Sequence, residues 1–227
     1  MNAPVPSFRR APLLSTLTYE KQLEIERASE EKTFKRRQII FNADQQNEHV
    51  FVLLSGRVKL FRTSRVGREL TLEIINPMDL FGEAGLLCSG MDYGATAEVL
   101  EDAVVSVMRR VDVASAIRDD CDALKEYVSL QERHRLAAED RLAEHVFYDV
   151  PTRIARLLCR LAETHGRNSK GGAMIRLKLT HQEIANLVGS TRETTTLILN
   201  DFKRRGLVEF SGRRIIVCDH DELTANG

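Results

Sequence analysis

The spacing of apolar residues changes along the chain, and each change predicts a different kind of structure. Residues 13–30 carry apolar positions at helical spacing and predict one or two short helices, whereas residues 1–12 are predicted to form a disordered tail. From residue 39 to residue 108, short apolar runs are separated by turn residues such as Ser55-Gly56. Many short strands at close, even spacing predict a β-sandwich or barrel. The apolar runs are residues 39–41, 50–54, 58–61, 70–75, 96–99 and 104–108.

A helical pattern returns after residue 112, and residues 121–148 contain neither Pro nor Gly, which predicts one long helix. A row of candidate seam residues on this helix alternates at steps of three and four. That spacing is typical of a two-helix coiled coil and predicts dimerisation, while the alternative is an amphipathic helix packed on its own domain. The seam residues are Leu124, Val128, Gln131, Arg135, Ala138, Leu142 and His145.

Asp149 and Pro151 mark the next predicted boundary. A carboxylate suits the N-cap of a helix, and Pro suits its first turn, where the missing N–H costs little. We therefore expect a new domain to begin at this point. The predicted divisions are a tail over residues 1–12, a strand-rich domain over 13–120, a dimerisation helix over 121–148 and a C-terminal domain over 149–227.

Residues 179–217 carry the strongest motif. Thr180 and Glu183 form a predicted capping box, with a hydroxyl at the N-cap and a carboxylate three residues later. Gly189 can adopt the left-handed conformation that ends a helix, and residues 192–203 predict a second helix. A short helix, a glycine turn and a second helix form the helix-turn-helix pattern. The residues expected to face inward on the second helix are Leu197, Ile198 and Phe202.

A predicted β-hairpin with a basic tip follows over residues 206–217, in the place of a wing. In a helix-turn-helix, the first residues of the second helix reach base edges in the major groove. Arg192 can donate two hydrogen bonds to guanine, and Glu193 can accept one from cytosine. The predicted DNA-binding residues are Thr180, His181, Thr191, Arg192, Glu193, Thr194, Thr196, Lys203, Arg213 and Arg214.

Charge distribution agrees with a nucleic-acid-binding module at the C-terminal end. Residues 150–227 contain 13 basic and 8 acidic residues, a net charge of +5, and the remaining residues contain 20 basic and 25 acidic residues, a net charge of −5. No run approaches the roughly 20 apolar residues of a membrane span, and residues 1–8 lack the features of a secretory signal, so we expect a cytoplasmic protein. The four cysteines form no CxxC pair, which argues against a zinc ribbon.

These features together strongly resemble the cAMP receptor protein (CRP)/FNR family of bacterial transcription factors. The resemblance extends from about residue 14 to residue 217. Residues 53–60, LLSGRVKL, resemble the β-roll signature of the family, and residues 79–86, DLFGEAGL, resemble the start of its ligand cassette. Residues 147–150, FYDV, resemble its hinge, and residues 191–194, TRET, are similar to its recognition-helix core.

The resemblance implies an α+β protein: an N-terminal double-stranded β-helix (a β-roll of the cyclic-nucleotide-binding type), a long dimerisation helix and a C-terminal winged helix-turn-helix. A homodimer of this kind binds double-stranded DNA at a palindromic operator, with one recognition helix in each of two successive major grooves. The Arg192-Glu193 pair implies half-sites related to TGTGA. One turn later, where cAMP-binding members carry a further base-reading Arg, this sequence has Leu197.

The ligand residues of the family are largely replaced. Tyr93-Gly94 stands where cAMP-binding members have the Arg-Ser pair that grips the cyclic phosphate, so the phosphate lacks its charge-assisted partner. The adenine-contacting hydroxyl pair aligns with Ala138-Glu139, and only the candidate ribose contact, Glu83, remains. We therefore predict that cAMP is not bound in the usual way. The predicted effector pocket comprises Phe81, Gly82, Glu83, Ala84, Tyr93, Gly94, Ala138 and Glu139.

Several modes of regulation stay open. An effector-independent regulator fits the replaced pocket residues best, followed by one with a different ligand, such as a cyclic dinucleotide or an apolar small molecule. Dependence on cAMP through another grip is a further alternative. No resident cofactor is predicted, although haem remains an alternative. Its candidate axial ligands are His49, His134, His145 and Cys88.

Two further expectations concern partners and rival functions. The loop at residues 168–173 corresponds to the region that contacts RNA polymerase in activating relatives, and a plain surface connection is the alternative. An enzyme is not predicted, because the sequence has no P-loop, GxGxxG, HExxH or nucleophile-elbow motif. A cyclic-nucleotide-binding module that never contacts DNA is disfavoured by Arg192, Glu193 and the basic wing.

Overall fold

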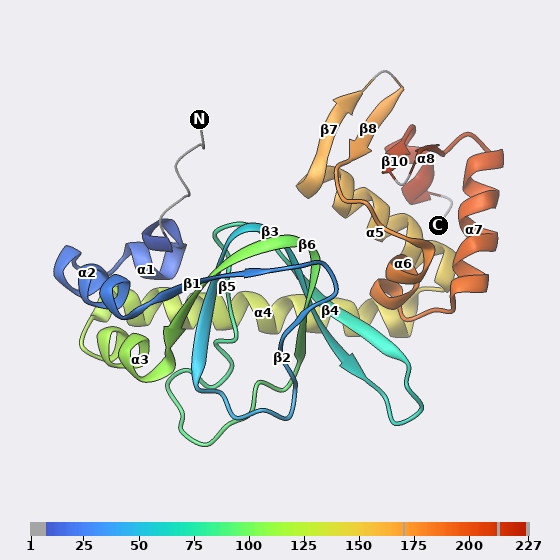
Figure 1. Ribbon diagram of the computed structural model, residues 1–227. Helices are drawn as coiled ribbons and strands as arrows, with labels where there is room; N and C mark the ends of the chain where they lie inside the picture. Colours follow the sequence, from blue (N-terminus) through green and yellow to red (C-terminus); the bar gives the residue numbers. More distant parts are fainter. Residues whose placement is uncertain (1–7, 170, 213, 226–227) are drawn as a thin grey trace. The chain divides into compact units, whose positions relative to one another are not determined.

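The computed structural model describes residues 8–169, 171–212 and 214–225. The chain divides into two compact units, Met1–Arg135 and Leu136–Gly227. The division falls within the longest helix, α4 (Cys121–Phe147), so this helix contributes to both units instead of forming a separate domain (Figure 1). Among the described helices, none combines the length and the apolar character that a membrane span requires.

An antiparallel sheet forms the body of the first unit. Its strand order is β1-β6-β3-β4, with β2 paired to β6 and β5 paired to β3. β3 and β6 are long and pair with each other along most of their length, as Figure 1 shows. The predicted β-roll is therefore confirmed. The strands are β1 (Glu30–Phe34), β2 (Ile39–Phe41), β3 (His49–Thr63), β4 (Glu69–Ile75), β5 (Leu80–Phe81) and β6 (Thr96–Arg109).

Ser55-Gly56, expected to be a turn, lies inside β3. The strand continues through both residues with shifts of register against β6 on either side, which is a β-bulge and not a reversal of the chain. Gly56 has φ +90°, and a Cβ atom there would lie 2.3 Å from the carbonyl oxygen of Asp102. Glycine is thus required by a close approach between two strands.

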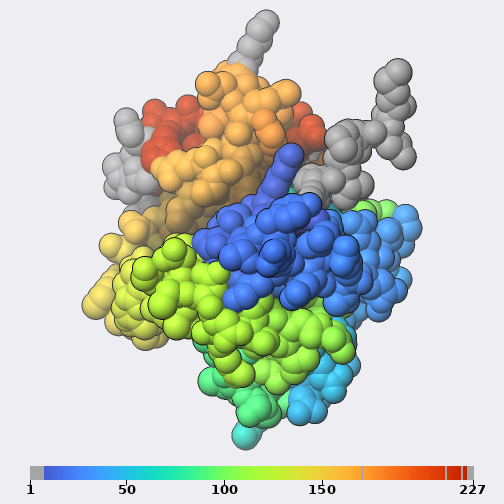
Figure 2. Space-filling view, turned by 90° about the vertical axis from the view of Figure 1, so that its left-hand side faces the viewer, coloured from blue at the N-terminus to red at the C-terminus, as the bar shows by residue number. Residues whose placement is uncertain are grey.

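Residues 8–12 were predicted to be part of a disordered tail, and this prediction is wrong for them. A 3₁₀-helix (Phe8–Arg10) precedes α1 (Pro12–Ser15), and Phe8 and Ala11 are buried. Apolar residues at helical spacing bring this segment into one hydrophobic cluster with α2 (Tyr19–Ala28), α3 (Arg110–Arg118) and the start of α4. Figure 2 shows the N-terminal segment, in blue, directly against the lime-green segment that contains α3.

Aromatic rings fill the interior of the β-roll. Phe41 stacks on Phe51 and Tyr93, with ring centroids 5.2 and 3.9 Å apart, and Phe51 stacks on Phe81 at 5.2 Å. Offset stacks of this kind stabilise a core beyond the burial of their area. Phe81, a predicted pocket residue, is therefore a core residue that is fully buried.

The second unit combines the end of α4 with helices and a four-stranded antiparallel sheet of order β7-β8-β10-β9. Asp149 caps α5 by accepting a hydrogen bond from the Thr152 backbone N–H at 3.0 Å, and Pro151 lies in the first turn, as the sequence predicts. The other elements are β7 (Gly166–Ser169), β8 (Gly172–Ile175), α6 (His181–Val188), α7 (Arg192–Arg204), β9 (Val208–Ser211), β10 (Arg214–Val217) and α8 (His220–Ala225), after α5 (Val150–His165).

A buried carboxylate joins α4 to α5 within this unit. Glu144 is 8% exposed and accepts hydrogen bonds from Arg156 Nε at 3.1 Å and from Arg160. Burial alone would raise the pKa of the Glu144 carboxyl, but the two guanidinium groups lower it below its usual range. The carboxylate thus stays charged and links the end of α4 to α5 through two ion pairs.

Candidate nucleic-acid interface

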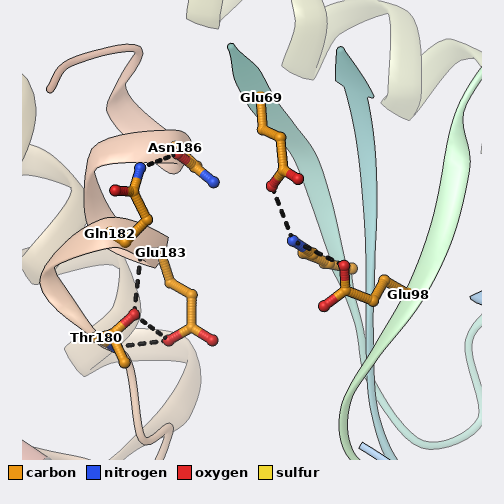
Figure 3. A network of polar contacts seen from close by, with 7 residues as sticks. Glu69, Glu98, Thr180, Gln182, Glu183 and Asn186 are labelled. Atoms are coloured by element: carbon orange, nitrogen blue, oxygen red, sulfur yellow. Dashed lines mark hydrogen bonds and ion pairs between the residues drawn. The ribbon is translucent and has the colours of Figure 1, made fainter. Parts of the chain in front are cut away.

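The first helix of the helix-turn-helix is held by its capping box. Thr180 Oγ1 accepts a hydrogen bond from the Glu183 backbone N–H at 3.2 Å, and Glu183 Oε2 accepts one from the Thr180 N–H at 2.6 Å (Figure 3). Two of the backbone N–H groups at this helix end are therefore satisfied. Thr180 was predicted as a DNA-binding residue; its side chain is committed to starting α6 at a fixed point.

The turn and the second helix follow the predicted pattern. Gly189 adopts the left-handed conformation with φ 66°, and Thr191 caps α7 by accepting from the Thr194 backbone N–H at 3.2 Å. The Thr191 hydroxyl in turn donates to Thr194 Oγ1 at 3.0 Å. These contacts set the direction of α7 at its first residue, which is the part of the helix that matters for reading bases.

The buried face of α7 differs from the one expected. Thr195 and Leu199 are fully buried and Phe202 is 2% exposed, so these three residues anchor the helix to its unit. Leu197 was expected to face inward, but it is 72% exposed. The inward face follows positions 195, 199 and 202, and the polar type of Thr195 concealed that face in the sequence.

Arg192 and Glu193 begin the exposed face of the helix. No hydrogen bond or ion pair joins either side chain to another residue in the described parts of the chain. Both side chains are therefore free to meet base edges. Thr196 lies one turn further on and donates its hydroxyl hydrogen to the Arg192 carbonyl at 2.8 Å.

His181 is brought to the same place from α6. Its Nδ1 lies 2.9 Å from Thr196 Oγ1. Because the single hydroxyl hydrogen of Thr196 is used by the Arg192 carbonyl, Nδ1 must be the donor in this contact. Nε2 then points away from the pair. Two residues predicted separately as DNA contacts thus form one polar cluster between α6 and α7.

The wing is the hairpin of β9 and β10. Ser211 pairs with Arg214 across the tip, where Gly212 has φ 64°. Arg214 is exposed, and Arg213 lies outside the described residues. Lys203, at the end of α7, is exposed and lies 6.0 Å from the centre of the Phe210 ring on β9, so the helix end and the wing present basic groups together.

The cassette residues of the first unit form an ion pair that the sequence did not reveal. Glu83 is 7% exposed, and its Oε1 lies 3.2 Å from Nδ1 of His134 on α4. Nε2 of the same ring lies 3.9 Å from Glu73. The hydrogen bond to Glu83 raises the pKa of His134, against the opposing effect of burial. The Glu83 carboxylate, the predicted ribose contact, therefore already has a hydrogen-bonding partner within the chain.

Tyr93 is the residue predicted to replace the family's phosphate-gripping Arg. It is 7% exposed, and its hydroxyl donates to the His49 carbonyl at 3.0 Å and accepts from the His49 N–H at 3.2 Å. Burial raises the pKa of the Tyr93 phenol, so it stays neutral. Gly94, with φ 71°, accepts a hydrogen bond through its carbonyl from Arg62 Nε at 2.6 Å.

The other predicted pocket residues differ in their exposure to solvent and in their hydrogen bonds. Gly82 is buried, and its carbonyl and that of the exposed Ala84 accept hydrogen bonds from Asn47 Nδ2 at 2.9 and 2.6 Å. Ala138 and Glu139 are exposed on α4 and belong to the second unit. Their part in an effector pocket stays a prediction.

An open pocket of about 540 Å³ lies at the mouth of the β-roll. Its lining combines apolar and aromatic side chains with a nearly equal share of polar and charged ones. It is lined by Lys32, Phe34, Ile40, Phe41, Gln45, Gln46, Glu48, His49, Phe51, Tyr93 and Val107.

Buried charge appears elsewhere in the β-roll at Lys59. Its side chain is 7% exposed, and its ammonium lies 3.1 Å from Glu69 and 3.3 Å from Glu98 (Figure 3). It also lies over the Phe61 ring at 4.4 Å. Two carboxylates on neighbouring strands compensate the charge, so this cluster joins three strands of the sheet.

The predicted dimer seam is only partly exposed. Val128 and Leu142 are 59% and 66% exposed, whereas Leu124 packs against the hydrophobic cluster of its own unit. Arg135 pairs with Glu132 through Nε at 3.0 Å, and Gln131 is half-buried. The apolar residues available to a partner on the described α4 are Val128, Leu136, Leu142, Val146 and Phe147.

Comparison with known proteins agrees with this architecture. The cyclic nucleotide-binding domain matches residues 31–120, and the Crp-like helix-turn-helix domain matches residues 152–225. The chain is 32% identical over 190 residues to the CRP-like cAMP-activated global transcriptional regulator of Mycobacterium tuberculosis, covering 84% of each chain. It is 30% identical over 189 residues to the global nitrogen regulator of Synechocystis, covering 82% of this chain and 83% of that one.

A solved structure of a CRP-family transcriptional regulator from Thermus thermophilus superposes with a TM-score of 0.72, at 29% identity, covering 86% of this chain and 95% of that one. A cyclic-nucleotide-binding β-roll joined to a Crp-like helix-turn-helix defines a DNA-binding transcription regulator. The chain belongs to the CRP/FNR family of such regulators, a family of transcription factors and not of enzymes. The family resemblance and the fold class predicted from the sequence are confirmed.

Proposed function

We propose that this regulator binds a TGTGA-related palindrome as a homodimer and does so without cAMP. The observation that carries the proposal is the start of α7. Arg192 and Glu193 are exposed there, on a helix whose beginning is fixed by the Thr191 cap and the Gly189 turn. A fixed helix start with a free guanidinium and a free carboxylate suits guanine and cytosine in neighbouring base pairs.

The basic groups around this helix suit phosphate contacts. Lys203 and Arg214 are exposed at the end of α7 and at the wing, and they position the protein without selecting a sequence. Several phosphate contacts per subunit predict a steep fall of affinity with salt concentration. A module that never contacts DNA shows no such dependence.

Exposed apolar residues on α4 support the homodimer. Val128 and Leu142 lie two heptads apart, at equivalent positions of a repeat that brings two helices together. A two-fold dimer with two α7 helices matches a palindromic operator. The β7–β8 hairpin, with Ser169 paired to Gly172, presents the predicted RNA polymerase contact; Lys170 lies outside the described residues.

Independence from cAMP is supported by Tyr93 and by the Glu83–His134 pair. The Tyr93 ring stacks 3.9 Å from Phe41, so an aromatic side chain stands where a cyclic phosphate would need a guanidinium. Glu83 is held by His134 at 3.2 Å. A different ligand is the second candidate, because the pocket of about 540 Å³ in the β-roll has the size of a small-molecule site.

The test is binding of the purified, ligand-free protein to a labelled TGTGA palindrome, with and without cAMP. Tight and specific binding that cAMP leaves unchanged is the expected result. Binding only with cAMP would overturn the proposed independence and reveal another grip on the phosphate. Absence of specific binding in both conditions would favour the alternative of a ligand-dependent regulator, with a cyclic dinucleotide, an apolar molecule or haem as effector, or of a different half-site.

A further inference from the structure

The geometry of α7 points to Leu197 as a base-reading residue, and we propose that it selects thymine through the C5 methyl group. The thymine lies in the base-pair column next to the one read by Glu193. This inference rests on the proposed function, in which α7 enters the major groove. Members of the family that bind cAMP carry a base-reading Arg at this position, and the inference assigns an apolar contact to the leucine that replaces it.

Leu197 lies on the face of α7 that carries the reading residues. It follows Glu193 by four residues, which places the two side chains on the same side of the helix about one turn apart. The opposite side is occupied by Leu199 and Phe202, which are 0% and 2% exposed. Leu197 is 72% exposed, so its isobutyl group projects away from the unit.

Other large apolar side chains exposed in the described part of the second unit have a different location. They lie on α4 or directly after it, where the proposed dimer seam and the hinge account for them, and they are Leu136, Leu142, Val146, Phe147 and Tyr148. Leu197 is thus an exposed apolar group on the DNA-facing helix that no packing within its own unit explains.

The chemistry of the major groove identifies its partner. An isobutyl group has no hydrogen-bond donor or acceptor, so it cannot recognise guanine, cytosine or adenine by their polar edges. The C5 methyl of thymine is the apolar group that the major groove offers. The neighbouring hydroxyls of Thr194 and Thr196 are already bonded to Thr191, His181 and the Arg192 carbonyl, and both threonines are less exposed than Leu197.

The first experiment selects half-sites from randomised DNA with the full-length protein and with Leu197→Ala. The wild-type protein should select thymine in one column beside the Glu193 column, and Leu197→Ala should lose that preference while keeping the Arg192 and Glu193 columns. Val66→Ala is the matched control, because Val66 is an 80% exposed apolar residue in the other unit. It should leave every column unchanged, and both variants should melt at the wild-type temperature.

The second experiment replaces the selected thymine of one half-site by deoxyuridine, which removes only the methyl group. Affinity of the wild-type protein should fall about four-fold, the equivalent of about 0.8 kcal/mol for one buried methyl. Leu197→Ala should bind both DNAs equally. A selected palindrome without a thymine column, or wild-type binding that is insensitive to deoxyuridine, would overturn the role of Leu197 alone. If the wild-type protein selects no sequence, the proposed function itself fails.

Discussion

The two units of this regulator differ in how they treat the positions that the family uses for recognition. In the second unit, Arg192 and Glu193 keep the residue types of the family's reading helix, and both side chains are exposed and unpaired among the described residues. In the first unit, Tyr93, the predicted replacement of the phosphate-gripping Arg, is buried, and Glu83 is paired within the chain. The predicted DNA-reading residues are thus exposed, whereas these predicted pocket residues are engaged within the chain.

This difference has a physical consequence for regulation. A ligand shifts a conformational equilibrium only by its differential affinity for the two states. Tyr93 stacks on Phe41 at 3.9 Å, so this ring belongs to the aromatic core of the β-roll. If the proposed independence from cAMP holds, packing of this kind, and not a bound ligand, keeps the β-roll in one state.

The largest expected effect is a loss of folding stability when the Tyr93 ring is removed from the interior of the β-roll. Tyr93→Ala should lower the free energy of unfolding by about 3–5 kcal/mol, because it removes a buried aromatic ring from a stacked core. Urea unfolding followed by circular dichroism measures this loss. Tyr93→Phe is the graded control: it keeps the ring and loses only the hydroxyl contacts with the His49 backbone, so it should cost about 1 kcal/mol. A loss below about 1 kcal/mol for Tyr93→Ala would show that the ring is not part of the core.

A smaller effect, confined to DNA binding, is expected from Arg192→Ala. It should weaken binding to the selected operator by about 1–3 kcal/mol and relax the base preference in one column. Unfolding should change by less than about 0.5 kcal/mol, because the Arg192 side chain is exposed. Fluorescence anisotropy with the operator and with a set of single-base variants gives both the affinity and the base preference.

The comparison with Lys203→Ala sharpens this prediction. Lys203 is exposed at the other end of α7, where a phosphate contact is expected. Its removal should weaken binding to all sequences by a similar factor and reduce the slope of log affinity against log salt by about 1. If Arg192→Ala behaves in the same way as Lys203→Ala, Arg192 contacts phosphate and the assignment of the reading pair is wrong.

Local contacts explain why the helix-turn-helix could be predicted from the sequence. The Thr180–Glu183 box and the Gly189 turn each depend on residues three or four positions apart. The bulge at Gly56 could not be predicted, because it depends on Asp102 of another strand. The Glu83–His134 pair was also missed, since a carboxylate in the cassette and a histidine on a distant helix share no spacing rule.

Leu197 shows a different limit of pattern reading. Leu197, Ile198 and Leu199 are three consecutive apolar residues, and a helix can bury only part of such a run. The buried position is decided by Thr195, which packs inward at 0% exposure although its type is polar. Side-chain packing, which the sequence pattern does not contain, therefore exposed a leucine that hydrophobicity alone would bury.

The smallest expected effect is a change in the pH dependence of folding stability, and it comes from His134 in the first unit. His134 faces Glu83 and Glu73, with Arg133 beside it on the same helix, and its pKa is raised by the hydrogen bond to Glu83. The ring therefore binds its proton more strongly in the folded state than in the unfolded state. Its contribution is fully present below the ordinary histidine pKa and is lost as the pH rises through the raised value in the folded protein.

His134→Gln should consequently lower the free energy of unfolding by no more than about 1 kcal/mol at acidic pH, with a difference from wild type that shrinks as the pH rises. Urea unfolding at a series of pH values measures this difference. The matched control is His145→Gln on the same helix, where the ring contacts the Arg141 carbonyl at 2.8 Å and forms no ion pair with a carboxylate among the described residues. If the stability advantage of the wild-type protein over His134→Gln grows with pH instead, the assignment is contradicted, because His134 would then stabilise the fold in its neutral form.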